Sequence, residues 1–315
     1  MDMKLRTIFM GTPDFAVPGL QSLLTSPDFE LIAVYTQPDK SVGRKHTLTA
    51  PPVKKTALEA NIPVFQPNKI KTAIEEIASL KPDLIVVIAY GKIIPQSILD
   101  IPKHGCINVH ASLLPKYRGA SCLQAPIKNG DTKTGVTIMK MDAGLDTGPI
   151  LKQLEIPLTG KENLEEVHDK LSKLGAENLP STLLEYCDNK IVAQEQDESQ
   201  TSYVGLISKE DGRLDPKNSA EELERQIRAY TPWPGTYLAL DNEEKLKIIK
   251  AEVAETSNSQ SIGSFYIEDG KLYLKCGQNS LHILKLQREN RKALSTSDFL
   301  KGNQDITKLV SSSNG

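Results

Sequence analysis

The first half of this chain alternates between two kinds of segment. Short β-branched apolar runs of strand length are separated by longer stretches in which apolar residues recur at helical spacing. This alternation is typical of a mostly parallel sheet flanked by helices, so we expect a Rossmann-like α/β domain. Strands are expected at 5–10, 31–36, 84–89 and 106–110, with 136–139 and 150–154 as an antiparallel continuation. Helices are expected at 17–24, 53–60, 72–80 and from 164 onward, where Pro180 should kink or break the helix.

The second half has a different texture. Residues 188–204 are rich in Asp, Glu, Gln and Ser and offer few side chains for a core, which predicts a linker. A helical segment at 220–230 is followed by short strands at 236–240, 245–251, 271–275 and 281–286. We therefore expect a catalytic domain at 1–187, a linker at 188–204 and a small β-rich domain, an OB-like barrel, at 205–315.

Composition narrows the classes of function. The chain has 38 Lys and Arg against 40 Asp and Glu, so a nucleic-acid partner would be held by local basic patches. The longest apolar run, 84–90, is far shorter than the roughly 20 residues that span a bilayer. Strand-like sequence from Leu5 leaves no room for a signal peptide. We expect a cytoplasmic protein with no membrane partner.

The cysteines and the first glycine argue against two cofactors. The four cysteines show no C-x-x-C pair, which indicates neither a zinc site nor a disulfide framework, and we expect no metal: Cys106, Cys122, Cys187 and Cys276. Gly11 follows the first strand, where a dinucleotide-binding protein would carry G-x-G-x-x-G, but the other glycines are missing. NAD is therefore disfavoured, and Gly11 is explained by a strand-to-helix turn.

Asn108 and His110 lie two residues apart in one expected strand. Alternate side chains share a face, so these two project together while Val109 points into the opposite layer. The strand ends at a loop, which places the pair at the carboxyl edge where open α/β sheets bind ligands. The alternative is a histidine satisfied by a neighbour within the sheet edge.

A loop with two glycines, 142–148, adds two carboxylates. Its glycines allow backbone conformations closed to other residues, and Asp146 or Asp142 could reach the histidine from there. Both aspartates are equally explained as turn formers, and spacing alone does not decide between the two readings.

Several motifs together resemble a known family. The run 108–119, then Asn129-Gly130-Asp131 and 141–148, resembles the signature of enzymes that take a formyl group from 10-formyltetrahydrofolate. Within that superfamily, segments 9–15, 37–39, 43–44, 52–54 and 232–234 are similar to those of methionyl-tRNA formyltransferases. The resemblance covers about the first 290 residues. It implies the formyltransferase fold, 10-formyltetrahydrofolate as cosubstrate, initiator methionyl-tRNA as partner, and Asn108, His110 and Asp146 as the catalytic residues.

The same resemblance implies binding residues. The folate cosubstrate would lie beside Ser112, Leu113, Leu114, Pro115, Tyr90 and Gly91. The tRNA would contact a basic loop and, in the second domain, a strand with alternating lysines: Lys40, Arg44 and Lys45, then Lys245 and Lys247. A solvated loop and a solvent-facing strand edge would show the same charges. We expect a monomer.

The sequence departs from the family pattern at three places. Ser41-Val42 stands where the loop usually has a proline, Ser121-Cys122 stands where Ala-Pro is usual, and Pro126 replaces another residue type. Formyl transfer to an amine needs no thiol, so we expect Cys122 to be a small buried residue.

Three other functions fit parts of the sequence. A formyltransferase acting on an amino sugar nucleotide or another small amine shares the core signature, and so does a formyltetrahydrofolate hydrolase. The loop at 37–54 favours tRNA over a sugar acceptor. A noncatalytic RNA-binding protein on an enzyme scaffold would be expected to have lost the catalytic trio, and all three residues are present.

Overall fold

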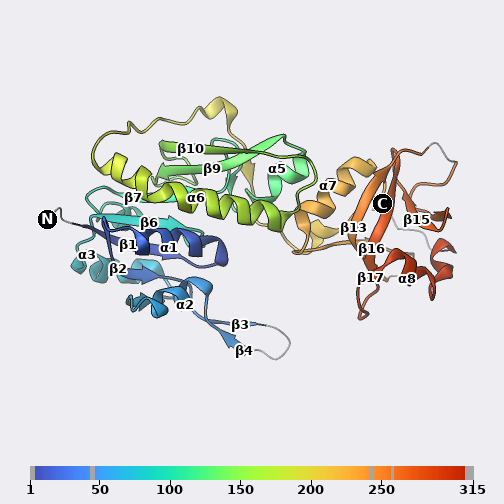
Figure 1. Cartoon of the computed structure of the whole chain (residues 1–315), viewed down its shortest axis with the longest axis horizontal. Helices are drawn as coiled ribbons and strands as arrows, with labels where there is room; N and C mark the ends of the chain where they lie inside the picture. The colour runs from blue at the N-terminus through green and yellow to red at the C-terminus, as the bar shows by residue number, and fades with distance from the viewer. Residues whose placement is uncertain (1–3, 43–46, 242–243, 257–258, 309–315) are drawn as a thin grey trace. The chain divides into compact units, whose positions relative to one another are not determined.

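The computed structural model describes residues 4–42, 47–241, 244–256 and 259–308 (Figure 1). Contacts between backbone positions divide the chain into two units. Unit 1 comprises residues 1–122, 134–156 and 168–204, and unit 2 comprises 123–133, 157–167 and 205–315. Two short internal segments thus group with the C-terminal residues, a division that sequence composition does not reveal.

Unit 1 is built on a seven-stranded sheet of order β10-β9-β7-β6-β1-β2-β5. Strands β5, β2, β1, β6 and β7 are parallel, and β9 runs antiparallel to β7, as expected. The α/β class is therefore confirmed. The strands are β1 (Leu5–Gly11), β2 (Phe29–Tyr35), β5 (Val64–Phe65), β6 (Leu84–Ile88), β7 (Cys106–His110), β9 (Lys133–Lys140) and β10 (Ile150–Pro157).

Helices pack on both faces of this sheet. A Cβ at Gly19 of α1 would meet Ile88 of β6 and Leu179 of α6, so α1 and α6 lie on one face, across which both run in Figure 1. The opposite face packs Ile85 and Val87 in a cluster with apolar residues of α3 and α4. The helices of unit 1 are α1 (Val17–Thr25), α2 (Pro52–Glu59), α3 (Ile74–Ser79), α4 (Gln96–Leu99) and α6 (Leu164–Cys187), the first turn of which belongs to unit 2; α5 (Gln124–Asn129) belongs to unit 2 as well.

Helix α6 continues through Pro180, so a break at this residue is wrong, and a kink there stays a prediction. The neighbouring Leu179 and Leu183 are both fully buried. A proline inside a helix costs about 3 kcal/mol, and burial of two leucines contributes a similar amount in the opposite direction. Tertiary packing therefore outweighs the local preference.

The segment expected as a linker, 188–204, packs on unit 1. Gln194 exchanges two backbone hydrogen bonds with Ile150, of 2.7 and 2.8 Å. Further along, β11 (Tyr203–Val204) pairs with β8 (Arg118–Gly119) in parallel. Of its polar side chains, Gln196 is buried, and Gln196 and Ser202 hydrogen-bond to other parts of unit 1. We call residues 194–204 the strap.

Unit 2 contains helix α7 and an antiparallel sheet of order β12-β13-β16-β15-β14, with β17 beside β16. A capping box of Ser219 and Glu222 starts α7, whose Leu223 and Ile227 enter the core. The antiparallel β-rich class is as expected, and closure into a barrel stays a prediction. The elements are α7 (Ala220–Tyr230), β12 (Thr236–Ala239), β13 (Lys245–Ala254), β14 (Phe265–Glu268), β15 (Lys271–Lys275), β16 (Ser280–Gln287), β17 (Leu294–Ser295) and α8 (Thr296–Leu300).

None of the helices within the described ranges is both long and apolar enough to cross a membrane.

Candidate active site at the carboxyl edge of the sheet

His110 is the last residue of β7 and is only 6% exposed. Its Nε2 atom lies 3.0 Å from the carbonyl oxygen of Tyr117. Because a carbonyl oxygen can only accept a hydrogen bond, Nε2 carries the hydrogen. The Nδ1 atom is then the group of the ring that faces Asp146.

Asp146 approaches His110 from the loop that precedes β10. Its Oδ2 atom lies 3.6 Å from Nδ1 of His110 and accepts a hydrogen bond of 2.8 Å from the backbone N–H of Gly119. The first distance is that of an ion pair and is too long for a hydrogen bond. Asp146 itself has a φ of +56°, a left-handed conformation that is uncommon for a residue with a side chain.

The surroundings of His110 favour its charged form. Burial of the ring opposes protonation, but the charge interaction and hydrogen bond with the Cys122 sulfur, the Asp146 carboxylate and the Tyr117 carbonyl together raise the pKa of His110 to about 9. Cys122 is buried, as expected, but its contact with His110 was not. No spacing signal in the sequence indicates that contact, because it depends on how the loop after β8 returns to the edge.

Asn108 lies on the same strand, paired in register with Val87 of β6 and Met139 of β9. It is half-buried, and the pleat of β7 places it on the same face as His110. Val109 points to the other face, where a Cβ at Gly175 of α6 would lie 3.0 Å from it. The expected split of β7 into a polar face and a packing face is therefore observed.

The residues expected beside folate differ in how far their side chains are buried. Ser112 is fully buried, and its hydroxyl donates to the carbonyl of Lys116 at 2.7 Å. Leu114 is buried as well, and its carbonyl accepts a hydrogen bond from Gln153 at 2.6 Å. These bonds fix the backbone of the loop and leave the half-buried Leu113 and Pro115 as its more accessible apolar side chains.

Tyr90 presents no side chain to this edge. Its ring is 2% exposed and packs in the cluster under α3 and α4. Its carbonyl accepts hydrogen bonds from Thr12 at 2.9 Å and Gln37 at 3.1 Å. Gly91 is exposed, with a φ of +78° that favours glycine. Tyr90 therefore shapes this corner from within the core.

The basic residues expected to contact tRNA lie in two places. Lys40 is exposed on the hairpin of β3 (Lys40–Val42) and β4 (Thr47–Thr49), and Arg44 and Lys45 lie outside the described residues. At the base of this hairpin, Lys54 Nζ lies 2.9 Å from both carboxylate oxygens of Asp39.

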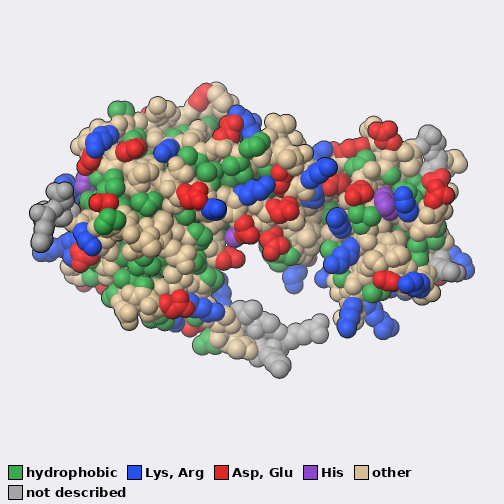
Figure 2. Space-filling view, viewed as in Figure 1, with side chains coloured by type: hydrophobic (Ala, Val, Ile, Leu, Met, Phe, Trp, Pro, Cys, Tyr) green, Lys and Arg blue, Asp and Glu red, His purple; other side chains and the backbone are tan. Residues whose placement is uncertain are grey.

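In unit 2, Lys245 and Lys247 are both exposed on β13. They share a face with Tyr237 of β12, which pairs with Lys247 and lies 4.7 Å below the Lys245 ammonium. Figure 2 shows further Lys and Arg side chains at the turn between β16 and β17, which includes Arg288, Arg291 and Lys292. Charges of both signs are interspersed elsewhere on this view.

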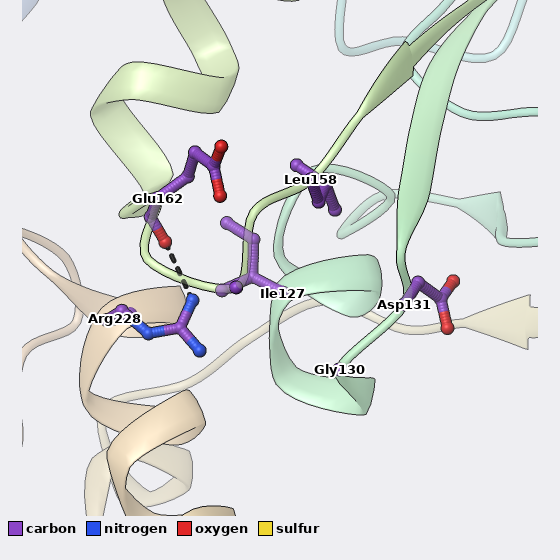
Figure 3. A pocket seen from close by; sticks show the side chains of 7 residues that line it. Ile127, Gly130, Asp131, Leu158, Glu162 and Arg228 are labelled. Atoms are coloured by element: carbon purple, nitrogen blue, oxygen red, sulfur yellow. Dashed lines mark hydrogen bonds between the residues drawn. The ribbon is translucent and has the colours of Figure 1, made fainter.

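Unit 2 also contains a small pocket, shown in Figure 3, whose polar groups are engaged within the protein. Arg228 Nη1 donates to the carbonyl of Glu162 at 2.8 Å, and the Glu162 carboxylate accepts the N–H groups of Thr159 and Lys161. Although burial opposes ionisation, these N–H groups lower the pKa of Glu162 to about 2. The polar groups of this pocket therefore stabilise the fold of unit 2.

No group of three or more His, Cys, Asp or Glu side chains in the described part of the chain is arranged to hold a metal ion.

Comparison with known protein families gives two matches. Residues 3–183 match the family described as Formyl transferase, and residues 206–304 match Formyl transferase, C-terminal domain. A methionyl-tRNA formyltransferase of Geobacter sulfurreducens is 48% identical over 301 residues, covering 95% of this chain and 94% of the relative. A methionyl-tRNA formyltransferase of Pseudomonas savastanoi is 43% identical over 307 residues and 97% of both chains.

Solved structures share the fold at low identity. WlaRD, a sugar 3N-formyl transferase, aligns with a TM-score of 0.66 at 23% identity, over 91% of this chain and 99% of that one. HypX from Aquifex aeolicus, in complex with tetrahydrofolic acid, aligns with a TM-score of 0.60 at 15% identity, over 96% of this chain and 47% of that one. The sequence relatives carry the assignment further than these folds: the chain belongs to the methionyl-tRNA formyltransferase family.

Proposed function

We propose that this chain transfers the formyl group of 10-formyltetrahydrofolate to the amino group of methionine on initiator methionyl-tRNA. The product, N-formylmethionyl-tRNA, serves translation initiation. The observation that carries the proposal is the ion pair of His110 and Asp146 at the carboxyl edge of β7, in a chain of this family. Asn108, on the same strand face, completes the proposed catalytic trio.

The reaction forms one bond to the formyl carbon and breaks another. The amino nitrogen bonds to the formyl carbon, the bond from that carbon to N10 of the folate breaks, the amine loses a proton and N10 gains one. Attack first gives a tetrahedral oxyanion, and donors fixed where this charge develops lower the barrier. The amide of Asn108 is such a donor, and the positive charge of the His110 ring, whose two N–H groups face Tyr117 and Asp146, stabilises the oxyanion electrostatically.

Asp146 acts on both the histidine and the amine. Its carboxylate stabilises the charged imidazole, and it receives the proton that the attacking amine loses, directly or through a water molecule. A free α-amino group has a pKa of about 7.7–8.0, and the ester lowers it, so much of the amine is already neutral. Oxyanion stabilisation and the alignment of two substrates are therefore the larger tasks, with alignment contributing up to about 7–11 kcal/mol.

The substrates fit the exposed parts of the two units. An apolar loop with Leu113 and Pro115 suits a flat pterin, with Ser112 and Leu114 fixing the loop and Tyr90 and Gly91 forming the adjacent corner. The tRNA phosphates are bound by two basic groups: Lys40, Arg44 and Lys45 in the sequence segment 40–49, and Lys245 and Lys247 of β13. We further propose a monomer acting in the cytoplasm, where charged initiator tRNA is used.

An acceptor panel tests this function. Purified protein is given labelled 10-formyltetrahydrofolate with charged initiator tRNA, charged elongator tRNA, an amino sugar nucleotide, or no acceptor. We expect label on the initiator methionyl-tRNA. Formylation of the sugar nucleotide alone would replace tRNA with a sugar acceptor, and rapid release of formate without acceptor would indicate a hydrolase.

A further inference from the structure

Arg118 of β8 is fully buried next to the proposed active site. Its guanidinium donates to the side-chain oxygen of Gln196 through Nε at 3.1 Å and Nη2 at 2.8 Å. It also donates to the Glu198 carboxylate, at 2.7 and 3.1 Å, and to the Tyr203 hydroxyl at 3.1 Å. All three partners belong to the strap, so Arg118 fixes the strap to unit 1.

Gln196 connects Arg118 to the loop that carries Asp146. Its side-chain nitrogen donates to the carbonyl of Asp146 and to the carbonyl of Gly148, both at 2.8 Å. Its side-chain oxygen is already held by Arg118 from the other side. Because both ends of the amide are bonded, Gln196 has one orientation, and it joins Arg118 to the backbone on both sides of Thr147.

The strap also contacts the other side of the His110–Asp146 pair. The Tyr117 N–H donates to the Ser202 hydroxyl at 2.9 Å, and Tyr117 is the residue whose carbonyl holds His110. Asp146 keeps its left-handed backbone conformation, which persists in proteins only where the surroundings over-determine it. The hydrogen bonds that Gln196 donates to the Asp146 loop stabilise this backbone conformation.

We propose that Arg118 and Gln196 are positioning residues for formyl transfer: they hold the Asp146 carboxylate against His110 through the two carbonyls that Gln196 binds. The role in catalysis rests on the function proposed above, whereas the positioning itself concerns only the His110–Asp146 pair. Glu198 is not part of this connection, because its side chain is 71% exposed and bonds to Arg118 and, within the strap, to Thr201, but not to the Asp146 loop.

Gln196→Glu separates positioning from attachment of the strap. A carboxylate at this position keeps the contact with Arg118 but can only accept, so it cannot donate to the carbonyls of Asp146 and Gly148. Gln196→Ala removes both contacts. Arg118→Lys keeps the charge but loses the planar fork that holds the amide. Glu198→Gln is the matched control on the same strap.

Two readouts apply to each variant: the single-turnover formylation rate and the His110 pKa measured by NMR. We expect Gln196→Glu, Gln196→Ala and Arg118→Lys to lower the rate about 10- to 100-fold. The His110 pKa should fall, and the thermal midpoint should fall less in Gln196→Glu than in Gln196→Ala, because the bond to Arg118 remains. Glu198→Gln should leave the rate and the pKa unchanged.

The outcomes distinguish the two proposals. If Gln196→Ala fails to fold, Gln196→Glu decides the question by the same readouts. A wild-type rate and a wild-type His110 pKa in Gln196→Glu would overturn the positioning role. If the wild-type protein formylates no tRNA, the function fails, and the His110 pKa in these variants still tests whether Gln196 holds Asp146 in place.

Discussion

The Nε2 atom of His110 donates to the carbonyl oxygen of Tyr117 at 3.0 Å, and this bond leaves Nδ1 as the ring nitrogen that faces Asp146. With a hydrogen on Nε2, a neutral imidazole would direct the Nδ1 lone pair at the Asp146 carboxylate 3.6 Å away. Protonation of Nδ1 turns this repulsion into attraction. The geometry at Nδ1 therefore favours the imidazolium, in the same direction as the pKa of His110, which is raised to about 9.

This state predicts how stability depends on pH. The pKa of His110 is about 9 in the folded chain against 6.5 unfolded, so its contribution is complete below about pH 6.5 and is lost as the pH rises through 9. This difference in pKa corresponds to at most about 3.4 kcal/mol in the free energy of unfolding. Urea titrations at pH 6, 7.5 and 9 measure it. The decline should be smaller in His110→Gln, and equal declines in the two proteins would argue against a charged His110.

Cys122 contributes to that pKa and provides a second prediction. Replacing Cys122 with Ala removes the two largest contributions that raise the His110 pKa, so this pKa should fall. An NMR titration of the imidazole measures the change. Cys187→Ala, at a half-buried cysteine, is the control and should leave the titration unmoved. An unchanged His110 pKa in Cys122→Ala would show that Asp146 alone sets it.

Gly119 has no room for a side chain. It has a φ of +111°, and a Cβ there would lie 2.3 Å from the carbonyl oxygen of Val204. Gly119→Ala should force β11 away from β8, lower the free energy of unfolding by about 2–4 kcal/mol and reduce turnover, because the Gly119 N–H holds Asp146. Chemical unfolding and rate measurements check both effects. Gly205→Ala, where a Cβ meets no atom within 4 Å, is the control, and equal effects at both glycines would contradict this explanation.

Glu162 predicts a separate effect in acid. Its pKa is about 2 in the folded chain, below the usual 4.5, so its contribution is present above about pH 4.5 and is lost as the pH falls toward 2. Glu162→Gln should cost about 1–2 kcal/mol at pH 7 and flatten the acid limb of the unfolding curve. Unfolding curves from pH 7 to pH 3 measure both. The exposed Glu165→Gln should match wild type, and a full acid limb in Glu162→Gln would assign it to other carboxylates.

Much of the fold follows from the sequence, because periodicity reports local structure. The strands at β6, β7 and β15 and the helix α7 lie within a residue of the expected ranges. The loop carrying Asp146 was expected near His110 only through the family resemblance, since the spacing of Asp142 and Asp146 is equally that of a turn.

The strap shows where sequence patterns fail. Residues 188–204 have the composition of a linker, and yet Gln196 is buried against the carbonyls of Asp146 and Gly148. A hydrogen bond from a side chain to a backbone group far away in the sequence produces no periodic pattern of residues. Tyr90 differs in the same way: its place at the end of β6 was expected, but the direction of its ring depends on the left-handed turn at Ala89, where φ is +47°.

The central claim is that His110 and Asp146 act in the chemical step. The most direct measurement is the single-turnover formylation of initiator methionyl-tRNA by His110→Ala and Asp146→Asn, with His104→Ala, in the loop before the same strand, as the control. We expect both active-site variants to be at least about a hundredfold slower, with folate affinity largely intact, as for groups that act in the transition state. Rates near wild type in both variants would contradict the mechanism.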